Sequence, residues 1–390
     1  MIPKICNLDE NENLMWLNTS LLEQVIVTSE EDDKVQVTLG KLTRATAAGD
    51  NYGSEMYRVI VQYKHRTECK TKSLIIKVLP RNNEMAKVLL KANMFTKEYS
   101  VLSSVTPTMY KLLQEASIPQ LHPFTPLCFY FHRTPDAIIM EDLKENGYKM
   151  AKRMLGLDIK HCMLVIRKLA RFHASSAVLH VTSRDMFKPF HESVYSDVSM
   201  SGQITKIVFA EKLHNLANNT VDLLIKFQES DENDFTVFKH GDLWLNNMMF
   251  KYSDESGEVQ DVRFVDFQLC HLGSASIDVL YFLHTSLSKD LIGQQCDLIQ
   301  EYHNTLKETL ASLGYEQLAP SIQGLQQELE RKRSYAVIVA CTVLPIILAD
   351  PNNIPDFEEM AKNDESINFS EEFKATIKLH LLEFERKGWL

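Results

Sequence analysis

Alternating apolar and polar residues predict strands in the first third of the chain. The segment Lys34–Leu39 alternates with a period of two, and Glu55–Tyr63 does so over a longer stretch. The apolar residues on one face of that longer stretch are Tyr57, Val59, Val61 and Tyr63. Ser73–Leu79 is apolar except for Lys77. An amphipathic helix over Asn13–Thr28 precedes these strands, so a sheet with a helix is expected here.

A helix that packs on this sheet is predicted over Glu84–Ser104. Its apolar residues recur at helical spacing: Met85, Val88, Leu89, Ala92, Phe95, Tyr99 and Leu102. Ala137–Met140 is another apolar strand, and the turn residues Asn146 and Gly147 follow it. We expect the hinge between two lobes at this point.

From Leu157 onward the pattern is mainly helical. Helices are predicted within Asp158–Ala177, Leu291–Leu313 and Ile322–Leu348. The apolar run Ala336–Ala349 is too short to span a bilayer and contains a proline, so it predicts a buried helix with a kink or break. The fold class is therefore α+β and bilobal. An N-terminal lobe, residues 1–142, has an antiparallel sheet plus a helix, and the C-terminal lobe, residues 143–390, is mainly helical.

Composition narrows the class of protein. The 390 residues include 45% hydrophobic and 24% charged residues with a formal net charge of −10, so no basic stripe argues for nucleic acid or an anionic membrane. The first residues lack the apolar core of a signal peptide, and a cytosolic location is expected. Seven scattered cysteines show no C-x-x-C pair, which disfavours a disulfide scaffold and a zinc site.

Two polar motifs between short strands carry the candidate chemistry. The first, His240–Asn247, reads H-G-D-L-W-L-N-N, and the second, Arg263–Gln268, reads R-F-V-D-F-Q. Short apolar runs flank the first motif, and a turn-rich segment leads into the strand before Asp266. Asp242, Asn247 and Asp266 are therefore expected to converge on one point. An ordinary polar surface loop is the alternative, and the ordered pair of motifs weighs against it.

Convergent oxygen ligands of this kind suit phosphoryl transfer from ATP. The protein's task in that reaction is to hold Mg²⁺ across the phosphates and to orient a hydroxyl nucleophile in line. In kinase-like folds an aspartate orients or deprotonates the hydroxyl, while a loop asparagine and a later aspartate bind the metal. These roles correspond to Asp242 as the catalytic base and to Asn247 and Asp266 as metal ligands.

Lys77 and Glu98 are candidates for binding the phosphates of ATP. A strand lysine and a glutamate on the following helix form the ion pair that aims the lysine at the α- and β-phosphates in kinase-like folds. Lys77 by itself also fits a snorkelling side chain at a sheet edge, and Glu98 a solvent-facing helix residue. The downstream motifs make the ion pair the favoured interpretation.

Two further segments are candidates for nucleotide binding. The loop Thr46–Ser54 stands where a phosphate-covering loop is expected, and its residues with this proposed role are Gly49, Asn51, Gly53 and Ser54. An ordinary β-turn explains this loop nearly as well. Backbone groups of Glu141 to Leu143 are expected to bind the adenine edge, with Met140 packing nearby; a plain strand end is the alternative.

The chain after Asp266 differs from a protein kinase. The interval from Asp266 to Asp278 is short, and no activation segment ending in A-P-E follows. Asp278 is expected at the start of a helix, where its carboxylate caps backbone N–H groups and braces the catalytic loop. His173 is interpreted as a packed helix residue rather than a catalyst.

The order of these motifs resembles the ecdysteroid kinase-like family, also called CHK-kinase-like. The motifs that carry the resemblance are H-G-D-L-W-L-N-N, R-F-V-D-F-Q, G-S-A-S-I-D-V-L-Y-F-L, I-M-E-D-L-K-E-N-G-Y and L-A-R-F-H-A-S-S, and the match covers roughly Gly49 to Leu283. The family is similar in fold to choline kinases and aminoglycoside phosphotransferases. It is abundant in insects and is associated with phosphorylating ecdysteroids and, by proposal, xenobiotic metabolites in detoxification.

By position, the resemblance implies the same roles for Asp242, Asn247, Asp266, Lys77 and Glu98, none of which is substituted. An inactive pseudokinase is therefore disfavoured. The resemblance also implies that His240 shapes the loop through hydrogen bonds and that Trp244 and Asn246 border the acceptor. A simple packing role is the alternative for each.

The leading hypothesis is an ATP- and Mg²⁺-dependent kinase of a small-molecule alcohol, such as a steroid-like or xenobiotic compound. An amino-alcohol or aminoglycoside kinase and a non-catalytic nucleotide-binding regulator remain as alternatives. We expect neither a membrane span nor an obligatory protein partner.

Overall fold

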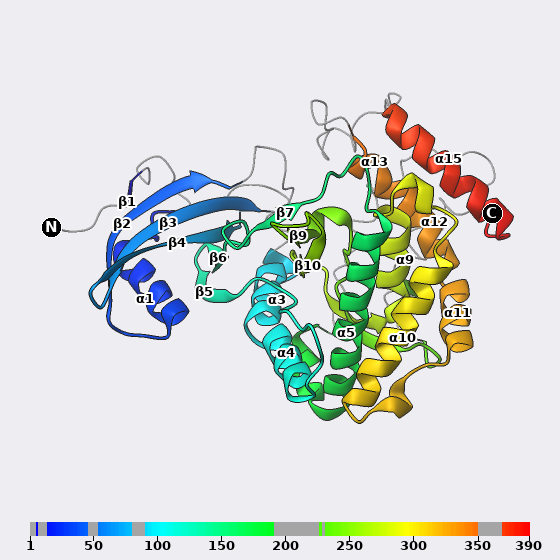
Figure 1. Cartoon of the computed structure of the whole chain (residues 1–390), viewed down its shortest axis with the longest axis horizontal. Coiled ribbons are helices and arrows are strands. Elements are labelled where there is room, and N and C mark those ends of the chain that lie inside the picture. The colour runs from blue at the N-terminus through cyan, green and yellow to red at the C-terminus, as the bar shows by residue number, and fades with distance from the viewer. Residues whose placement is uncertain are drawn as a thin grey trace. The chain divides into compact units, whose positions relative to one another are not determined.

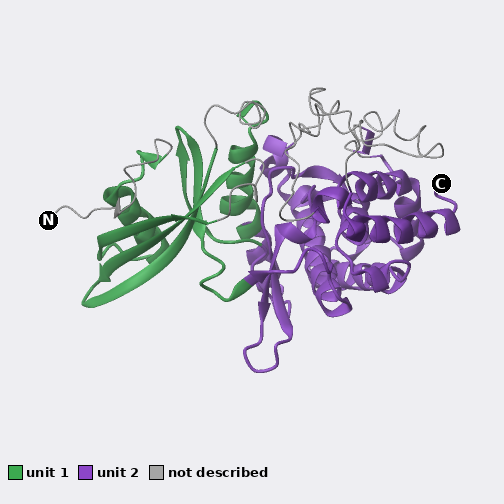
Figure 2. Ribbon diagram, turned by 90° about the horizontal axis from the view of Figure 1, so that it is seen from above, with its two compact units in different colours: residues 1–107, 125–148 green, residues 108–124, 149–390 purple. Residues whose placement is uncertain are grey.

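A computed structural model describes residues 5–6, 14–45, 54–79, 90–190, 226–227, 231–349 and 369–390 (Figure 1). The chain divides into two compact units, which Figure 2 distinguishes by colour. The first unit comprises residues 1–107 and 125–148, and the second comprises residues 108–124 and 149–390. The domain boundary after Asp142 that the sequence suggests stays a prediction.

A six-stranded sheet forms the centre of the first unit, in the order β1-β2-β3-β4-β6-β5. Its strands pair antiparallel except for β1, which runs parallel to β2. The strands are β1 (Ile5–Cys6), β2 (Val35–Arg44), β3 (Glu55–His65), β4 (Glu68–Val78), β5 (Cys128–Arg133) and β6 (Asp136–Glu141). The predicted face of β3 is confirmed, because Tyr57, Val59, Val61 and Tyr63 are all buried in one hydrophobic core.

Helix α1 (Thr19–Glu30) packs its apolar side chains Leu22, Val25 and Ile26 into the same core. The predicted start at Asn13 is wrong. The side chain of Asn18 accepts a hydrogen bond from the backbone N–H of Leu21 at 2.9 Å, and this N-cap begins the helix.

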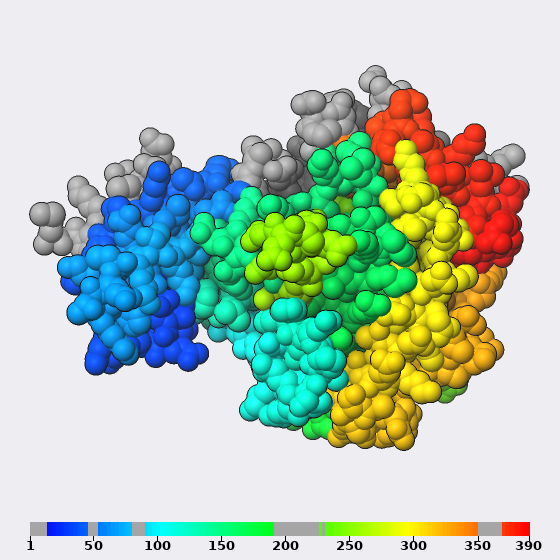
Figure 3. Space-filling model, viewed as in Figure 1, coloured from blue at the N-terminus to red at the C-terminus, as the bar shows by residue number. Residues whose placement is uncertain are grey.

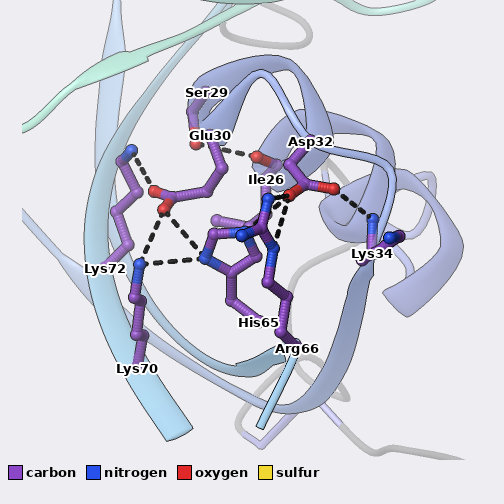
Figure 4. A network of polar contacts seen from close by, with 9 residues as sticks. All are labelled: Ile26, Ser29, Glu30, Asp32, Lys34, His65, Arg66, Lys70 and Lys72. Carbon is purple, nitrogen blue, oxygen red and sulfur yellow. Dashed lines mark hydrogen bonds and ion pairs between the residues drawn. The ribbon is translucent and has the colours of Figure 1, made fainter. Parts of the chain in front are cut away.

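Charged side chains fasten the end of α1 to the β3–β4 hairpin (Figure 4). Glu30 forms ion pairs with Lys70 at 3.3 Å and Lys72 at 3.0 Å. Asp32 contacts Arg66 at 2.6 Å and His65 at 3.1 Å. A hydrogen bond from the backbone N–H of Lys34, followed by those from the His65 and Arg66 side chains, lowers the pKa of Asp32. The turn that leads into β2 is thus fixed by several weak contacts rather than by one strong one.

The predicted helix over Glu84–Ser104 is longer and less regular than its sequence pattern. Its first residues, 84–89, lie outside the described residues. Helix α3 (Met94–Ser100) passes into a π-helical turn over Val101–Val105 and then into α4 (Thr106–Glu115), so the predicted end at Ser104 is wrong. Pro107 has no N–H to donate to the preceding turn, which explains the widened helix at this point.

The second unit is mainly helical, and the α+β fold class is confirmed. Its helices after α4 are α5 (Ile159–Thr182), α9 (Ala275–Thr285), α10 (Cys296–Ser312), α11 (Ile322–Arg331), α12 (Arg333–Thr342), α13 (Leu344–Ile347) and α15 (Glu371–Arg386). Helix α5 packs against α10, and α9 packs against α12. The predicted break in the last apolar run is present between α12 and α13. Within the described ranges, no helix has the length and apolarity needed to cross a membrane.

Short strands frame the two polar motifs in this unit. Strand β8 (Thr236–Lys239) pairs with β11 (His271–Ser274), and β9 (Met248–Tyr252) pairs with β10 (Val259–Phe264). The turn between β9 and β10 is exposed on the surface (Figure 3). Strand β7 (Tyr148–Met150) lies where the chain passes from the first unit to the second.

A buried ion pair holds β10 to the long helix α5. The ammonium group of Lys168 lies 2.6 Å from the Asp261 carboxylate. Burial lowers the pKa of Lys168 to about 8, against the opposing effect of Asp261. The strand that leads to Asp266 is therefore tied to the largest helix of the unit.

Candidate active site

The first motif forms a tight loop between β8 and β9. Gly241 has a φ of 82°, and a Cβ at this position would lie 2.3 Å from the carbonyl oxygen of Leu269. Only glycine combines this conformation with so close an approach. The loop is thereby pressed against the segment that follows Asp266.

Asp242 is surrounded by hydrogen-bond donors. The Asn247 side-chain amide donates to the Asp242 backbone carbonyl at 2.8 Å and to its Oδ2 at 2.9 Å. The indole Nε1 of Trp244 donates to the same Oδ2 at 3.3 Å, and the Tyr281 hydroxyl donates to Oδ1 at 2.6 Å. The structure thus brings Asp242 and Asn247 together, as the sequence predicts.

Burial raises the pKa of the Asp242 carboxyl group. The hydrogen bond from Tyr281 opposes this effect, while the negative charge of Asp266 adds to it. The group therefore holds a proton more readily than an ordinary aspartate. A carboxylate that gains basicity is suited to accept a proton from a hydroxyl.

Asp266 follows directly on residues that contact the first motif. The backbone N–H of Val265 donates to the carbonyl oxygen of Asn247 at 3.0 Å, which brings the chain after β10 beside the loop. Asp266 itself has a φ of 66°, a left-handed conformation that is uncommon for a residue with a side chain. Such conformations gather at functional sites. Its charge acts on Asp242, so all three predicted residues belong to one region of the second unit.

Asp278 braces the loop from helix α9. It lies in the first turn of that helix and accepts hydrogen bonds from the backbone N–H of His240 at 2.7 Å and of Gly241 at 2.9 Å. Burial alone would raise its pKa, but the hydrogen bond and charge of His173, with those loop contacts, lower it to about 2. The predicted bracing role is confirmed.

Two histidines complete this brace. His173 is fully buried on α5 and contacts Asp278 at 3.2 Å and the Tyr302 hydroxyl at 2.6 Å. The sequence correctly indicates a packed residue and misses both contacts. His240 contacts the carbonyl oxygen of Val265 at 3.0 Å, so its predicted role in shaping the loop is confirmed. Burial lowers the pKa of His240.

The predicted ion pair between Lys77 and Glu98 is present in the first unit. Nζ of Lys77, on β4, lies 2.7 Å from Oε2 of Glu98, on α3, and both side chains are buried. A snorkelling lysine at a sheet edge is excluded by this burial. The role of the pair in phosphate binding stays a prediction.

Lys77→Met is expected to lower the free energy of unfolding by about 2–4 kcal/mol, because the buried Glu98 carboxylate loses its nearest cation. The double variant Lys77→Met/Glu98→Gln should regain most of this loss, since no buried charge is left behind. Urea unfolding of the full chain measures both. A single variant as stable as the wild type contradicts this account of the pair.

Most of the predicted nucleotide loop lies outside the described residues. Gly49, Asn51 and Gly53 lie outside the described residues, and Ser54 directly precedes β3. The segment predicted to contact adenine is described. Met140 and Glu141 end β6, and Met140 and Leu143 are buried. The backbone N–H of Glu141 donates to Leu127, whereas that of Leu143 has no acceptor among the described residues.

The sequence did not predict the contacts of Asp142 that hold the segment from Met140 to Leu143 in place. Asp142 accepts hydrogen bonds from Arg58 Nε at 2.5 Å and from Ser73 Oγ at 2.7 Å, which ties it to β3 and β4. Burial would raise the pKa of Asp142, but the hydrogen bonds from Arg58 and Ser73 lower it. The sequence signal for this anchor was a polar pair on neighbouring predicted strands, Arg58 and Ser73. Tyr281 was not predicted either, although it stands three residues after Asp278 on a predicted helix.

The chain was compared with protein-family models, curated proteins and solved structures. A sequence model described as the ecdysteroid kinase-like family matches residues 48–211 and 203–315. No curated protein matches the chain.

Among solved structures, an amicoumacin kinase in complex with AMP-PNP and Ca²⁺ is 11% identical, with a TM-score of 0.45 and 88% of each chain covered. The ethanolamine kinase of Plasmodium vivax is 14% identical, with a TM-score of 0.42, covering 87% of this chain and 90% of that one. A GDP complex of aminoglycoside 2'-phosphotransferase-IIIa is 11% identical, with a TM-score of 0.39, covering 95% of this chain and 100% of that one.

Proposed function

The chain belongs to the ecdysteroid kinase-like family, a family of small-molecule phosphotransferases, and from this premise we propose a specific reaction. It transfers the γ-phosphoryl group of ATP to a hydroxyl of a steroid-like or xenobiotic alcohol, with Asp242 as the catalytic base and Mg²⁺ as the metal. A small-molecule alcohol is its partner in this proposal, and a cytosolic location stays a prediction.

The observation that carries the proposal is the environment of Asp242. Its carboxylate is held in a fixed direction by donors on both oxygens. Its pKa is raised by burial, with the charge of Asp266 adding to that effect. Fixed orientation and raised basicity are the two properties that general-base catalysis of hydroxyl attack requires. Neither property is needed by a regulator that only binds nucleotide.

The chemistry of Asn247 and Asp266 fits a magnesium ion. The Asn247 amide nitrogen donates to Asp242, which leaves its side-chain oxygen, Oδ1, for a ligand. Mg²⁺ prefers oxygen ligands and usually takes one or two from protein, the others coming from phosphates and water. No cluster of three or more His, Cys, Asp or Glu side chains suited to a metal occurs within the described ranges. When bound, the ion supplies charge neutralisation on the phosphates.

The first unit supplies the proposed nucleotide contacts. Lys77, oriented by Glu98, would hold the α- and β-phosphates. The Leu143 N–H would donate to the adenine edge beside the apolar side chain of Met140, and the anchored Asp142 keeps this segment in place. Gly49, Asn51, Gly53 and Ser54 are proposed to cover the phosphates through backbone N–H groups.

The test is transfer of labelled γ-phosphate from Mg·ATP to ecdysone, plant-derived alcohols, choline and an aminoglycoside, with Asp242→Asn in parallel. Transfer to ecdysone or a plant alcohol that the variant abolishes supports the proposal. Transfer only to choline or the aminoglycoside overturns the proposed acceptor and favours an amino-alcohol or antibiotic kinase. Binding of Mg·ATP with no transfer to any acceptor or to water favours a non-catalytic regulator.

A further inference from the structure

Among the side chains that donate to the Asp242 carboxylate, Tyr281 makes the shortest hydrogen bond. Its hydroxyl donates to Oδ1 of Asp242 at 2.6 Å, and the residue is 8% exposed on α9. Its ring lies 6.2 Å from that of Tyr335 on α12, centroid to centroid. Helix α9 packs against α12 (Figure 1). The Tyr281 hydroxyl group is therefore held at the carboxylate by a packed helix.

The donors around Asp242 leave little room for another. An ionised carboxylate has about four lone-pair directions. Asn247 and Trp244 both donate to Oδ2, and Tyr281 takes one direction on Oδ1. The direction left for an acceptor hydroxyl is therefore the second one on Oδ1, the oxygen that Tyr281 holds.

Helix α9 also fixes where Tyr281 stands relative to the loop. Asp278, almost one turn earlier on the same helix, binds the backbone N–H groups of His240 and Gly241. Residues three apart lie on the same side of a helix. One element thus holds the backbone of the catalytic loop through Asp278 and the side chain of Asp242 through Tyr281.

We propose that Tyr281 is a positioning residue for phosphoryl transfer, which directs the one remaining lone pair of Asp242 Oδ1 toward the acceptor hydroxyl. This inference rests on the proposed function and deepens it. Tyr281 acts only through Asp242: it keeps its proton, donates a hydrogen bond to that carboxylate throughout and takes no part in bond formation. Its effect belongs in kcat, since ATP makes none of these contacts.

The experiment compares wild type, Tyr281→Phe, Asp242→Asn and the double variant, using Mg·ATP with ecdysone and Mg·ATP alone, where water is the acceptor. Tyr281→Phe should lower kcat about 10- to 100-fold, the range for one hydrogen bond to a charged group, with KM for ATP within about twofold of wild type. In the Asp242→Asn background the same change should cost less than about twofold, because the group through which Tyr281 acts is already lost.

Tyr252→Phe is the matched control. It removes a hydroxyl that contacts His161 at 3.0 Å, at the far end of β9 from the catalytic loop, and its kcat should equal that of wild type. If Tyr281→Phe keeps full kcat while Asp242→Asn is inactive, the inference fails and the proposed function stands. An equal loss with and without Asp242 reduces Tyr281 to packing and also overturns the inference. Absence of transfer by the wild type to ecdysone, to plant-derived alcohols and to water overturns both; where only a plant-derived alcohol is phosphorylated, it replaces ecdysone in the comparison.

Discussion

Asp242→Asn is expected to lower kcat for phosphoryl transfer by about 10²- to 10⁴-fold, the usual contribution of a general base. Asparagine keeps the size of the side chain but cannot take up the proton of the attacking hydroxyl. The donors from Asn247, Trp244 and Tyr281 then face a neutral amide. KM for ATP should change little, because Asp242 itself makes none of the proposed nucleotide contacts. Steady-state kinetics with labelled ATP measure both constants.

The same variant should be as stable as the wild type or more stable. The folded-state pKa of Asp242 is raised above the ordinary value of 3.8 for an aspartate, so the ionised carboxylate costs folding free energy. That cost develops as the pH rises from about 4 through the folded pKa. The stability advantage of Asp242→Asn should therefore be present at neutral pH and vanish below about pH 4.

The raised pKa of Asp242 should also be visible in the pH profile of wild-type kcat. Because only the ionised carboxylate accepts a proton, the acid limb of kcat should lie above the usual range of an aspartate. Asp254→Asn, in the exposed turn after β9, is the control and should leave kcat and stability unchanged. Full activity of Asp242→Asn would remove the general base from the proposed mechanism.

Asp278→Asn is expected to lower both the free energy of unfolding and kcat. The buried carboxylate accepts from two loop N–H groups and from His173, and an amide oxygen replaces only part of this. Loss of such contacts in the interior costs about 2–4 kcal/mol of unfolding free energy. kcat should also fall at least about tenfold, since the loop that carries Asp242 loses its brace.

The pH dependence identifies the group responsible. The pKa of Asp278 is lowered from 3.8 to about 2 in the folded protein, so its contribution is present above about pH 4 and is lost as the pH falls toward 2. Urea unfolding at several pH values should show the difference between wild type and Asp278→Asn shrinking over that interval. Asp297→Asn, an exposed residue in the first turn of α10, should show no such difference. A pH-independent loss would assign the effect to packing instead.

Local sequence patterns predicted much of the fold and part of the candidate site. The alternation in β3 predicted its buried face because the period of a strand is two. The loop between two strands predicted the contact of Asp242 with Asn247, since both lie within five residues of each other. The lysine in an apolar strand, followed by a glutamate on the next helix and by the downstream motifs, predicted the ion pair of Lys77 with Glu98 because kinase-like folds combine these features.

Contacts between distant parts of the chain were not predictable in the same way. Arg58 and Asp142 are 84 residues apart, and no periodicity links a strand residue to the end of another strand. Tyr281 and Asp242 are separated by 39 residues. The sequence pattern of the helix that carries Tyr281 predicted a contact with the catalytic loop only for its aspartate, Asp278. Helix α1 begins later than its apolar spacing predicts, because the capping residue Asn18 sets its start.

Helix α9 turns the spacing between Asp278 and Tyr281 into a constraint on insertions and deletions. Adding one residue between them would rotate Tyr281 by about 100° around the helix axis and remove it from Asp242. An aspartate followed three residues later by a tyrosine, downstream of the catalytic loop, is thus a sequence pattern by which other genomes can be searched for chains that share this arrangement.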